Sequence, residues 1–530
     1  MKDGARGVKL LFVMETPEYL RYFDSTFALL LEQGHALALA VNEDKQKKQV
    51  RLERFGGGHP SLEILGVAPE HDGVWGEIAK GLRGTVDYVR FLHPDYRNAP
   101  ALRNRMTRKV LPVAFTPLSW ISTLPAPVVQ GMLAFLSRCE RAIPPSREIL
   151  AFIDRIRPDA VFVSPLVDAA SAQVDFIKAA RHVGVPAGVC VASWDNLTNK
   201  GLLRIEPDLV TVWNETQRDE AAKYHAVPRQ RVTATGAQLF DRWFERRPST
   251  DRETFCRTVG LPTDRPFFVF TGSSGFISEA GAEVAFTKRW LQAVRSSDNP
   301  AVANVGILVR PHPYNFKAWA EEDLQGVSAT TVWPRGPYNP IAEESRAVYY
   351  DTLYHAAGVF GINTSAMVEA AILGRPVFSL RAKEFSTTQE GTLHFHYLLV
   401  ENGGCVQLAG SMAEHISQLA GALEQPDRYT SQTRAFVERF LRPHGIDKPA
   451  VPIFAETLVG LARRGRQPKW RAASWWAVPV RGLVLGVSLV TGTIARLSDR
   501  RWRARARKDV SRWFERTYKR GRRLLSRKRK

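Results

Sequence analysis

The sequence has few cysteines, and none of them has the spacing that binds zinc or builds a disulfide framework. Its four cysteines, Cys139, Cys190, Cys256 and Cys405, lie far apart in a chain of 530 residues, and no CxxC pair occurs. Zinc-finger domains and small disulfide-stabilised domains are therefore excluded. A reduced location on the cytosolic side of a membrane is expected.

Uninterrupted apolar segments are also scarce. The N-terminal residues lack the apolar h-region of a signal peptide, because Glu15 ends the apolar run after seven residues. Residues 110–137 carry no charge, but four prolines within them would break a regular membrane-spanning helix. In residues 475–495, the uncharged part that follows Arg481 is too short to span. We expect residues 110–137 either to be buried or to dip into a membrane interface.

Acidic residues are nearly absent from the C-terminal end. Residues 500–530 hold sixteen Lys and Arg against two acids, Asp509 and Glu515, so they supply about +14 of the formal net charge of +21. Apolar and aromatic residues from Val510 onward fall near helical spacing. This pattern favours a basic amphipathic helix on an anionic membrane surface over a solvated tail. A specific nucleic-acid partner is not expected, because no RNA- or DNA-binding motif accompanies the charge.

The rest of the chain is typical of an α/β protein. Its length exceeds what one core comfortably holds, and apolar strands alternate with helices, which predicts parallel sheets covered on both faces. A helix over residues 24–33, capped by Asp24, is expected after the first strand. The expected strands are residues 8–14, 36–41, 159–165, 185–193, 207–214 and 231–236 in a first set, and 267–272, 305–313, 356–363 and 375–380 in a second.

Composition also predicts the domain boundaries. Residues 241–266 are charged, rich in turn formers and poor in apolar runs, so the linker is expected there. The expected parts are an N-terminal Rossmann-like domain over 1–244, a linker over 245–265, a C-terminal Rossmann-like domain over 266–445, a connecting helix over 446–470 and a basic amphipathic tail over 471–530.

The first candidate site follows the strand at 305–310. Prolines at 311 and 313 fix the backbone and present Arg310 and His312 at the C-terminal edge of the sheet, where open α/β sheets bind ligands. An arginine and a histidine together favour an anion, most naturally a phosphate. A simple turn with a hydrogen-bonded histidine is the structural alternative.

The second candidate site lies in GINTSAMVEAAILGRPVF, residues 361–378. A strand leads through Asn363, Thr364 and Ser365 into a short helix that ends at Gly374, which predicts an anion at the helix start. Glu369 lies too far along for a capping box. It stands one turn into the helix on the side of Ser365, where it could accept hydrogen bonds from ribose hydroxyls. A structural polar contact is the alternative.

Two further groups of residues complete the candidate site. Gly272, Ser273 and Ser274 follow the first strand of the second domain, and small residues there allow a ligand to approach the backbone. This loop matches neither the P-loop nor GxGxxG. In the first domain, Glu15 and Asp195 follow strand ends and are candidates for a general base, with Glu15 preferred. Each could instead cap a turn or helix.

These motifs resemble a known family. Two α/β domains with a cleft between them resemble the GT-B fold of nucleotide-sugar glycosyltransferases. Within that superfamily the chain is most similar to the branch of CDP-glycerol glycerophosphotransferases and of Kdo, sialic acid and capsule transferases. Residues 310–313 resemble that branch's His-Pro motif, and residues 363–365 with Glu369 resemble its serine-containing phosphate loop. The resemblance covers residues 7–445, although no Asp/Glu-Asp/Glu-Gly motif of the sialyltransferases is found.

The resemblance implies transfer of a sugar from a nucleotide-activated donor to a hydroxyl of an envelope polysaccharide or lipid-linked glycan. The donor is then a substrate and no cofactor is expected. No metal is expected either, because no DxD-type cluster is evident. The implied location is the cytoplasmic, inner face of the cell membrane, with residues 471–530 as a peripheral anchor. The alternatives are glycerophosphotransfer, a nucleotide-sugar 2-epimerase and a non-catalytic envelope-assembly protein.

Overall fold

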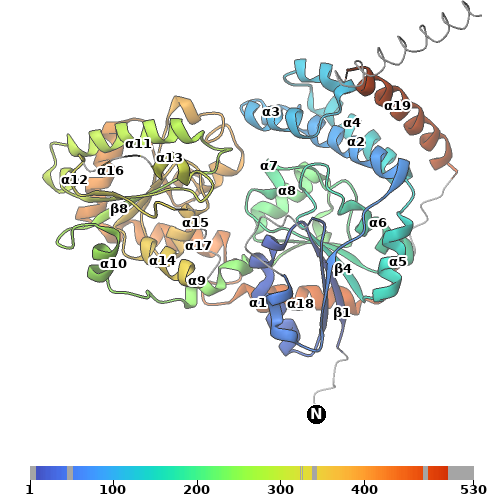
Figure 1. The fold of residues 1–530 in the computed structure, drawn as a ribbon, viewed down its shortest axis with the longest axis horizontal. Helices are drawn as coiled ribbons and strands as arrows, with labels where there is room; N and C mark the ends of the chain where they lie inside the picture. The colour runs from blue at the N-terminus through green and yellow to red at the C-terminus, as the bar shows by residue number, and fades with distance from the viewer. Residues whose placement is uncertain are drawn as a thin grey trace, which may run out of the picture.

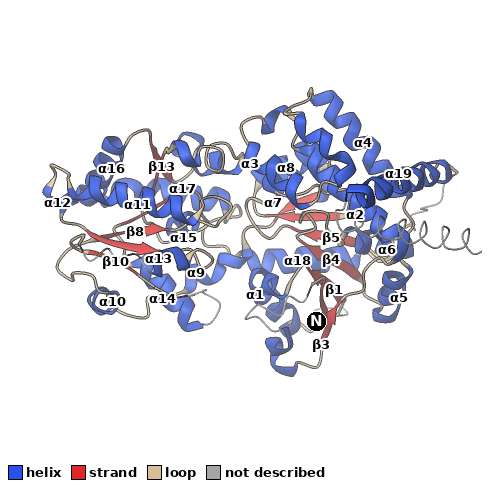
Figure 2. Cartoon of the chain, turned by 45° about the horizontal axis from the view of Figure 1, so that its top comes forward, coloured by secondary structure: helices blue, strands red, loops and turns tan. Residues whose placement is uncertain are grey.

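The structure, a computed structural model, contains two α/β domains that lie side by side (Figure 1). It describes residues 7–43, 52–320, 322, 324, 326–336, 343–468 and 475–498. Each domain has a central parallel sheet with helices on both faces, as the second view also shows (Figure 2). The predicted α/β fold with two Rossmann-like domains is therefore confirmed.

The first domain is built on a seven-stranded sheet. Its strands are β1 (Lys9–Met14), β2 (Ala36–Val41), β3 (Leu62–Val67), β4 (Ala160–Ser164), β5 (Ala187–Cys190), β6 (Leu209–Val212) and β7 (Val232–Ala234). They are ordered β3-β2-β1-β4-β5-β6-β7, and every neighbouring pair is parallel. The central strands are buried over nearly their whole length, as their continuous apolar sequences predict.

Helices lie on both faces of this sheet and over one end of it, and the last of them, α9, also packs against the second domain. They are α1 (Leu20–Glu32), α2 (Gly73–Arg90), α3 (Pro100–Lys109), α4 (Ala126–Ala142), α5 (Arg147–Ile156), α6 (Val174–Val183), α7 (Asn196–Asn199), α8 (Glu215–His225) and α9 (Asp241–Glu245). The prediction for α1 needs correction, because the helix begins at Leu20. Asp24 therefore lies inside it and does not cap it. Its carboxylate instead accepts hydrogen bonds from the Ser25 N–H and from Arg242.

The second domain repeats the same strand order with six strands, β10-β9-β8-β11-β12-β13. These are β8 (Phe267–Thr271), β9 (Gly306–Arg310), β10 (Thr330–Val332), β11 (Gly358–Gly361), β12 (Val377–Leu380) and β13 (Val406–Ala409). Its helices are α10 (Arg252–Val259), α11 (Ala280–Arg295), α12 (Pro300–Ala303), α13 (Phe316–Ala320), α14 (Glu343–Tyr354), α15 (Ala366–Ile372), α16 (Met412–Glu424) and α17 (Thr430–Phe440).

The chain crosses between the domains twice. Helix α10 forms inside the segment expected to be a linker, and its Phe255, Cys256 and Val259 are buried in the core of the second domain. Helix α18 (Ala450–Arg463), within the expected connecting segment, returns to the first domain, where Phe454 packs against Phe23 of α1 with ring centroids 5.9 Å apart. The first domain is thus completed by residues from the far end of the chain.

A further layer of helices covers one end of the first domain (Figure 1). The uncharged segment at 110–137 is broken, as its prolines predict, into a 3-10 helix, η4 (Val113–Trp120), and the start of α4. Helix α19 (Ala477–Ser498) packs against α4, η4 and α2. Across the residues that the structure describes, no helix has the length and apolar character needed to cross a membrane. The amphipathic helix predicted from Val510 onward lies outside the described residues.

Buried charges at the end of α2 fix a loop of the first domain. The Asp87 carboxylate is fully buried and accepts hydrogen bonds from the N–H groups of Ala170 and Leu202, at 2.7 and 2.9 Å, and from the Arg204 guanidinium. Arg90, one turn further on, donates to three backbone carbonyls between residues 197 and 201. The end of α2 therefore holds the loop that follows β5.

We expect Asp87→Ala to lower the free energy of unfolding by about 3–5 kcal/mol, because Arg204 would remain buried without its partner. Urea unfolding measures this loss. The matched control is Glu253→Ala, which breaks the exposed pair with Arg257 and should cost less than about 1 kcal/mol. Equal effects of the two substitutions would contradict the assigned role of Asp87.

Candidate functional site

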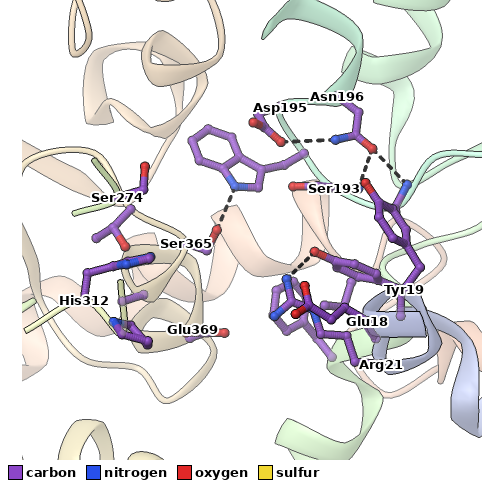
Figure 3. A pocket seen from close by; sticks show the side chains of 18 of the residues that line it. Glu18, Tyr19, Arg21, Ser193, Asp195, Asn196, Ser274, His312, Ser365 and Glu369 are labelled. Atoms are coloured by element: carbon purple, nitrogen blue, oxygen red, sulfur yellow. Dashed lines mark hydrogen bonds between the residues drawn. The ribbon is translucent and has the colours of Figure 1, made fainter. Parts of the chain in front are cut away.

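A cleft of about 580 Å³ lies between the two domains (Figure 3). The first domain contributes the start of α1 and the loop after β5, and the second contributes the loops after β8, β9 and β11. Seven of the side chains predicted from sequence line this cleft: Asp195, Ser274, His312, Asn363, Thr364, Ser365 and Glu369.

The position of the cleft follows from the strand order. In the second sheet, successive strands are added on one side from β8 to β10 and then on the other from β11 to β13, so the order reverses between β8 and β11. Loops that leave two adjacent parallel strands in opposite directions open a crevice at the carboxyl ends of the strands, and ligands of open α/β sheets bind there. Residues 272–275 and 362–365 are those loops.

The loop after β8 contributes only one of the three predicted side chains. Ser274 lines the cleft, but Ser273 is fully buried and its N–H donates to Glu283 at 2.7 Å. Gly272 is needed for packing, because a Cβ there would lie 2.7 Å from the backbone nitrogen of His312. The absence of a side chain at Gly272 therefore allows the loops after β8 and β9 to approach each other. Gly272 was expected to let a ligand approach the backbone, but it does not line the cleft.

His312 lines the cleft as a neutral hydrogen-bond donor. Its Nδ1 accepts a hydrogen bond from the Tyr314 N–H at 3.2 Å, which leaves Nε2 to carry the ring proton. Burial, together with the nearby charge of Arg21, lowers the pKa of His312 to about 4. The predicted anion contact of His312 therefore depends on an N–H donor and not on an imidazolium charge.

Arg310 is placed differently from the prediction, because it lies behind the cleft wall. It is buried, donates to the Thr352 hydroxyl at 3.2 Å, and its guanidinium stands 4.7 Å from the centre of the Tyr349 ring. The charge still acts on the cleft, since it lowers the pKa of Glu369. Arg310 does not line the cleft, so the predicted direct contact between Arg310 and a bound anion is not seen in this structure.

The Asn363–Ser365 segment is partly committed to the protein itself. The Asn363 side-chain amide donates to the Thr388 carbonyl at 3.0 Å, and the Ser365 hydroxyl accepts from Trp194 of the first domain at 3.3 Å. Helix α15 has seven residues, and the N–H groups of residues 367–369 already bond to the carbonyls of Thr364 and Ser365. The hydroxyls of Thr364 and Ser365, more than the helix start, are what this segment offers to an anion.

Glu369 faces the cleft from the first turn of α15, as predicted (Figure 3). It is half-buried, and it accepts a hydrogen bond from the Tyr349 hydroxyl. Burial raises the pKa of Glu369 to about 7, against the lowering influence of Tyr349, Arg21 and Arg310. A carboxyl group with this pKa changes its charge near neutral pH and can accept hydrogen bonds from ligand hydroxyls when ionised.

The two candidate bases differ in position. Asp195 lines the cleft, where its carboxylate accepts from the side-chain amides of Asn196 at 3.3 Å and Asn199 at 3.0 Å. Burial alone would raise the pKa of Asp195, but the nearby His394 and Lys200 hold it below its usual value. Glu15, the preferred candidate from sequence, is not among the residues that line the cleft, and it accepts from the Ser171 hydroxyl at 3.5 Å.

The basic side chains of the cleft come mainly from residues that the sequence did not single out. Arg21, on the first turn of α1, faces both Glu369 and His312 closely enough to influence their pKa values. Its own pKa is raised, chiefly by Tyr22. Further bases line the same cleft: Arg105, Lys200, Arg242, Arg246 and Arg346. Because α1 was expected to begin at Asp24, four residues too late, Arg21 was not recognised as part of its first turn.

Aromatic rings line much of the remaining wall. Tyr22, Trp243, Tyr349 and Tyr350 border the cleft near Glu369, and Trp243 lies 5.8 Å from Tyr349 between ring centroids. Such rings can stack on a planar ligand group. Within the described ranges, no group of three or more His, Cys, Asp or Glu side chains is arranged to hold a metal ion.

Comparisons with known proteins found similarity in structure but not in sequence. No family model and no curated protein matches the chain. Among solved structures, it is similar to the UDP-GlcNAc 2-epimerase from Methanocaldococcus jannaschii, with 12% identity and a TM-score of 0.46 over 86% of this chain and 100% of that chain.

Two glycosyltransferase structures are also similar to it. One, from Rickettsia africae, has 8% identity and a TM-score of 0.48 over 87% of this chain and 98% of that chain. The other is WaaG, a glycosyltransferase involved in lipopolysaccharide biosynthesis, with 11% identity and a TM-score of 0.42 over 86% and 100%. Similarity this distant assigns no activity to the present chain.

We expect Glu369→Gln to stabilise the protein more at about pH 8 than at about pH 6. The folded pKa near 7 lies above the ordinary value of 4.5, so the folded state holds a proton that the unfolded state has lost, and stability falls as pH rises through 7. Over that interval the difference between variant and wild type should grow by about 1 kcal/mol. Urea unfolding at both pH values measures it, and a difference independent of pH would contradict the raised pKa.

Proposed function

We propose that this protein is a glycosyltransferase that moves a sugar from a nucleotide-activated donor to an acceptor hydroxyl without a metal ion. The observation that carries this proposal is the arrangement at the reversal point of the second sheet. There, the hydroxyls of Ser274, Thr364 and Ser365 and the N–H of His312 from the neighbouring loop could bind a phosphate. The carboxylate of Glu369 lies in the same cleft and could accept hydrogen bonds from a diol. An ionised carboxylate of the first domain borders the same cleft.

The donor nucleotide is assigned to the second domain. His312 Nε2–H and the hydroxyls of Ser274, Thr364 and Ser365 would donate to phosphate oxygens, and Arg21 would add positive charge from the opposite domain. Glu369 would accept from the ribose hydroxyls while one of the neighbouring aromatic rings stacks on the base. In this arrangement, each domain supplies part of the donor site.

The reaction is a displacement at the anomeric carbon of the donor sugar. The acceptor oxygen forms a new bond to that carbon while the bond from the carbon to the phosphate oxygen breaks. The hydroxyl proton passes to Asp195, and the electron pair of the broken bond leaves with the nucleotide phosphate. Donors fixed in advance around the departing phosphate stabilise its growing negative charge, which is where electrostatic preorganisation contributes most.

The acceptor and the membrane attachment are proposed from the chemistry of the sequence. The basic residues 500–530 would attract an anionic leaflet with roughly 1 kcal/mol for each Lys or Arg near the surface. An envelope polysaccharide or a lipid-linked glycan at the inner face of the cell membrane is the acceptor class that such an attachment favours. CDP-glycerol-dependent glycerophosphotransfer would use the same phosphate-binding side chains and is the second candidate.

A thermal-shift panel of UDP, CDP, CMP and GDP tests the donor site. We expect one nucleotide to raise the unfolding temperature, and Glu369→Ala to weaken its affinity about tenfold through loss of the diol contact. CMP would favour a Kdo-like donor, CDP the glycerophosphotransferase alternative, and UDP or GDP an ordinary sugar donor. The control is Glu401→Ala, an exposed acid outside the cleft. No response to any nucleotide would contradict both enzyme proposals.

We expect Asp195→Asn to lower the turnover of the donor at least about 100-fold while leaving donor affinity unchanged, because only the proton acceptor is lost. Release of free nucleotide from the sugar donor chosen by the panel measures turnover. Asp427→Asn, at an exposed position on the second domain, is the control. Unchanged turnover in Asp195→Asn would remove Asp195 from the mechanism and return Glu15 to consideration.

A further inference from the structure

Large apolar side chains are exposed mainly on one part of the first domain. Of the thirteen that stand out as exposed among the described residues, ten belong to η4, α4, α19 or the residue pair just before α19. Trp120 and Trp475 are 84% and 85% exposed. The ten, which we call the apolar face, are Val113, Trp120, Val128, Phe135, Trp475, Val478, Leu483, Val487, Leu489 and Val490.

Helix α19 packs against the other two elements that carry this face, η4 and α4. Its inner side packs on α2 through Val484 and Leu485, and the Arg481 guanidinium donates to the Ala142 carbonyl at the end of α4 at 2.7 Å. Its outer side carries Val478, Leu483 and Leu489, where an ordinary surface helix would carry charges. The sequence of the helix contains two arginines and no acid. Figure 1 and Figure 2 both show α19 lying along α4.

The segment that contains η4 and α4 has almost no acidic residues. Residues 97–142 contain seven Lys and Arg but one acid, Glu140. That acid is fully buried and paired with Arg83 and Lys178, so it adds no negative charge to the surface. Exposed bases remain on α3 and α4: Arg108, Lys109, Arg138 and Arg141. The surface of this segment therefore carries positive charge and no negative charge.

We propose that the apolar face docks on the surface of an anionic lipid bilayer, with its tryptophans and aliphatic side chains in the interfacial region and the bases of α3 and α4 at the headgroups. Exposed apolar area, exposed tryptophan and basic residues without acids are the combination that interfacial attachment requires. This docking adds a folded surface to the basic C-terminal residues and does not depend on the chemistry assigned to the cleft.

The docked surface is connected to the cleft through two helices. Arg105 of α3 lines the cleft and lies 4.2 Å from the centre of the Phe276 ring of the second domain. The end of α2 holds the loop after β5 through Asp87 and Arg90. A bilayer under α3, α4 and α19 would therefore lie on the side of the first domain that bears Asp195 and Lys200. An acceptor with a lipid anchor could then reach the cleft from the membrane.

The test is flotation of the full-length protein with phosphatidylglycerol–phosphatidylcholine vesicles. We expect the double variant Trp120→Glu/Leu489→Glu to bind at least about tenfold more weakly than wild type, because two large side chains no longer enter the interface. Raising the salt from about 0.1 M to about 1 M screens the basic residues but not apolar contact. Wild type should therefore retain binding at high salt that the double variant loses.

Val67→Glu, an exposed apolar residue on β3 away from the apolar face, is the matched control and should float like wild type. Circular dichroism and the unfolding temperature establish that each variant is folded. Equal flotation of wild type and the double variant at both salt concentrations would overturn the proposal and leave the C-terminal residues as the membrane contact. A wild-type dimer that the double variant converts to a monomer with unchanged flotation would show that a second copy covers this face, and would also overturn it.

Discussion

Every strand of both sheets pairs in parallel with its neighbours, so the carboxyl ends of all strands of a sheet come together at one edge. This constraint brings Ser274, His312 and Ser365 together, although they are separated by ninety-one residues of sequence and belong to three different strand-end loops. The same order in the first sheet places Asp195 at the corresponding edge. Helix α18 then fixes the first domain by packing on α1.

The two domains contribute different charged and polar side chains to the cleft. In the second domain, burial keeps His312 uncharged and Arg310 lies behind Tyr349, while Arg346 of α14 adds a basic side chain to the cleft. Arg21 of the first domain adds positive charge close enough to lower the pKa of His312. The hydrogen bond from Trp194 to Ser365 joins the two halves directly. The hydrogen-bond donors and the basic side chains of the cleft therefore come from both domains.

The sequence predicted the central strands and seven of the side chains that line the cleft for a physical reason. Strands buried on both faces are continuously apolar, and the polar residues that follow them, such as His312 and Ser365, lie at a sheet edge in any parallel fold. The edge strands β3, β10 and β13 were not recognised. β3 is partly exposed along its length, β10 has only three residues and β13 has four with a glutamine among them, so none of them forms a long continuous apolar run.

The direction in which individual side chains point could not be predicted from the sequence. Arg310 and His312 are two residues apart, yet one is buried against Tyr349 and the other borders the cleft. Ser273 and Ser274 are adjacent, and only contacts such as Glu283 with the Ser273 N–H decide which of them faces a ligand. Glu369 was recognised because a carboxyl group in an apolar helix has no simple packing role, whereas Tyr349, its partner from α14, gave no comparable signal.

The central claim is that the reversal point of the second sheet binds an activated nucleotide. A crystal structure of the protein with the nucleotide that raises its unfolding temperature most would test this directly. We expect phosphate oxygens within hydrogen-bond distance of His312 Nε2 and the Ser274 and Ser365 hydroxyls, and ribose hydroxyls within hydrogen-bond distance of Glu369. A nucleotide bound elsewhere, or bound in this cleft with its phosphates away from His312, would contradict it.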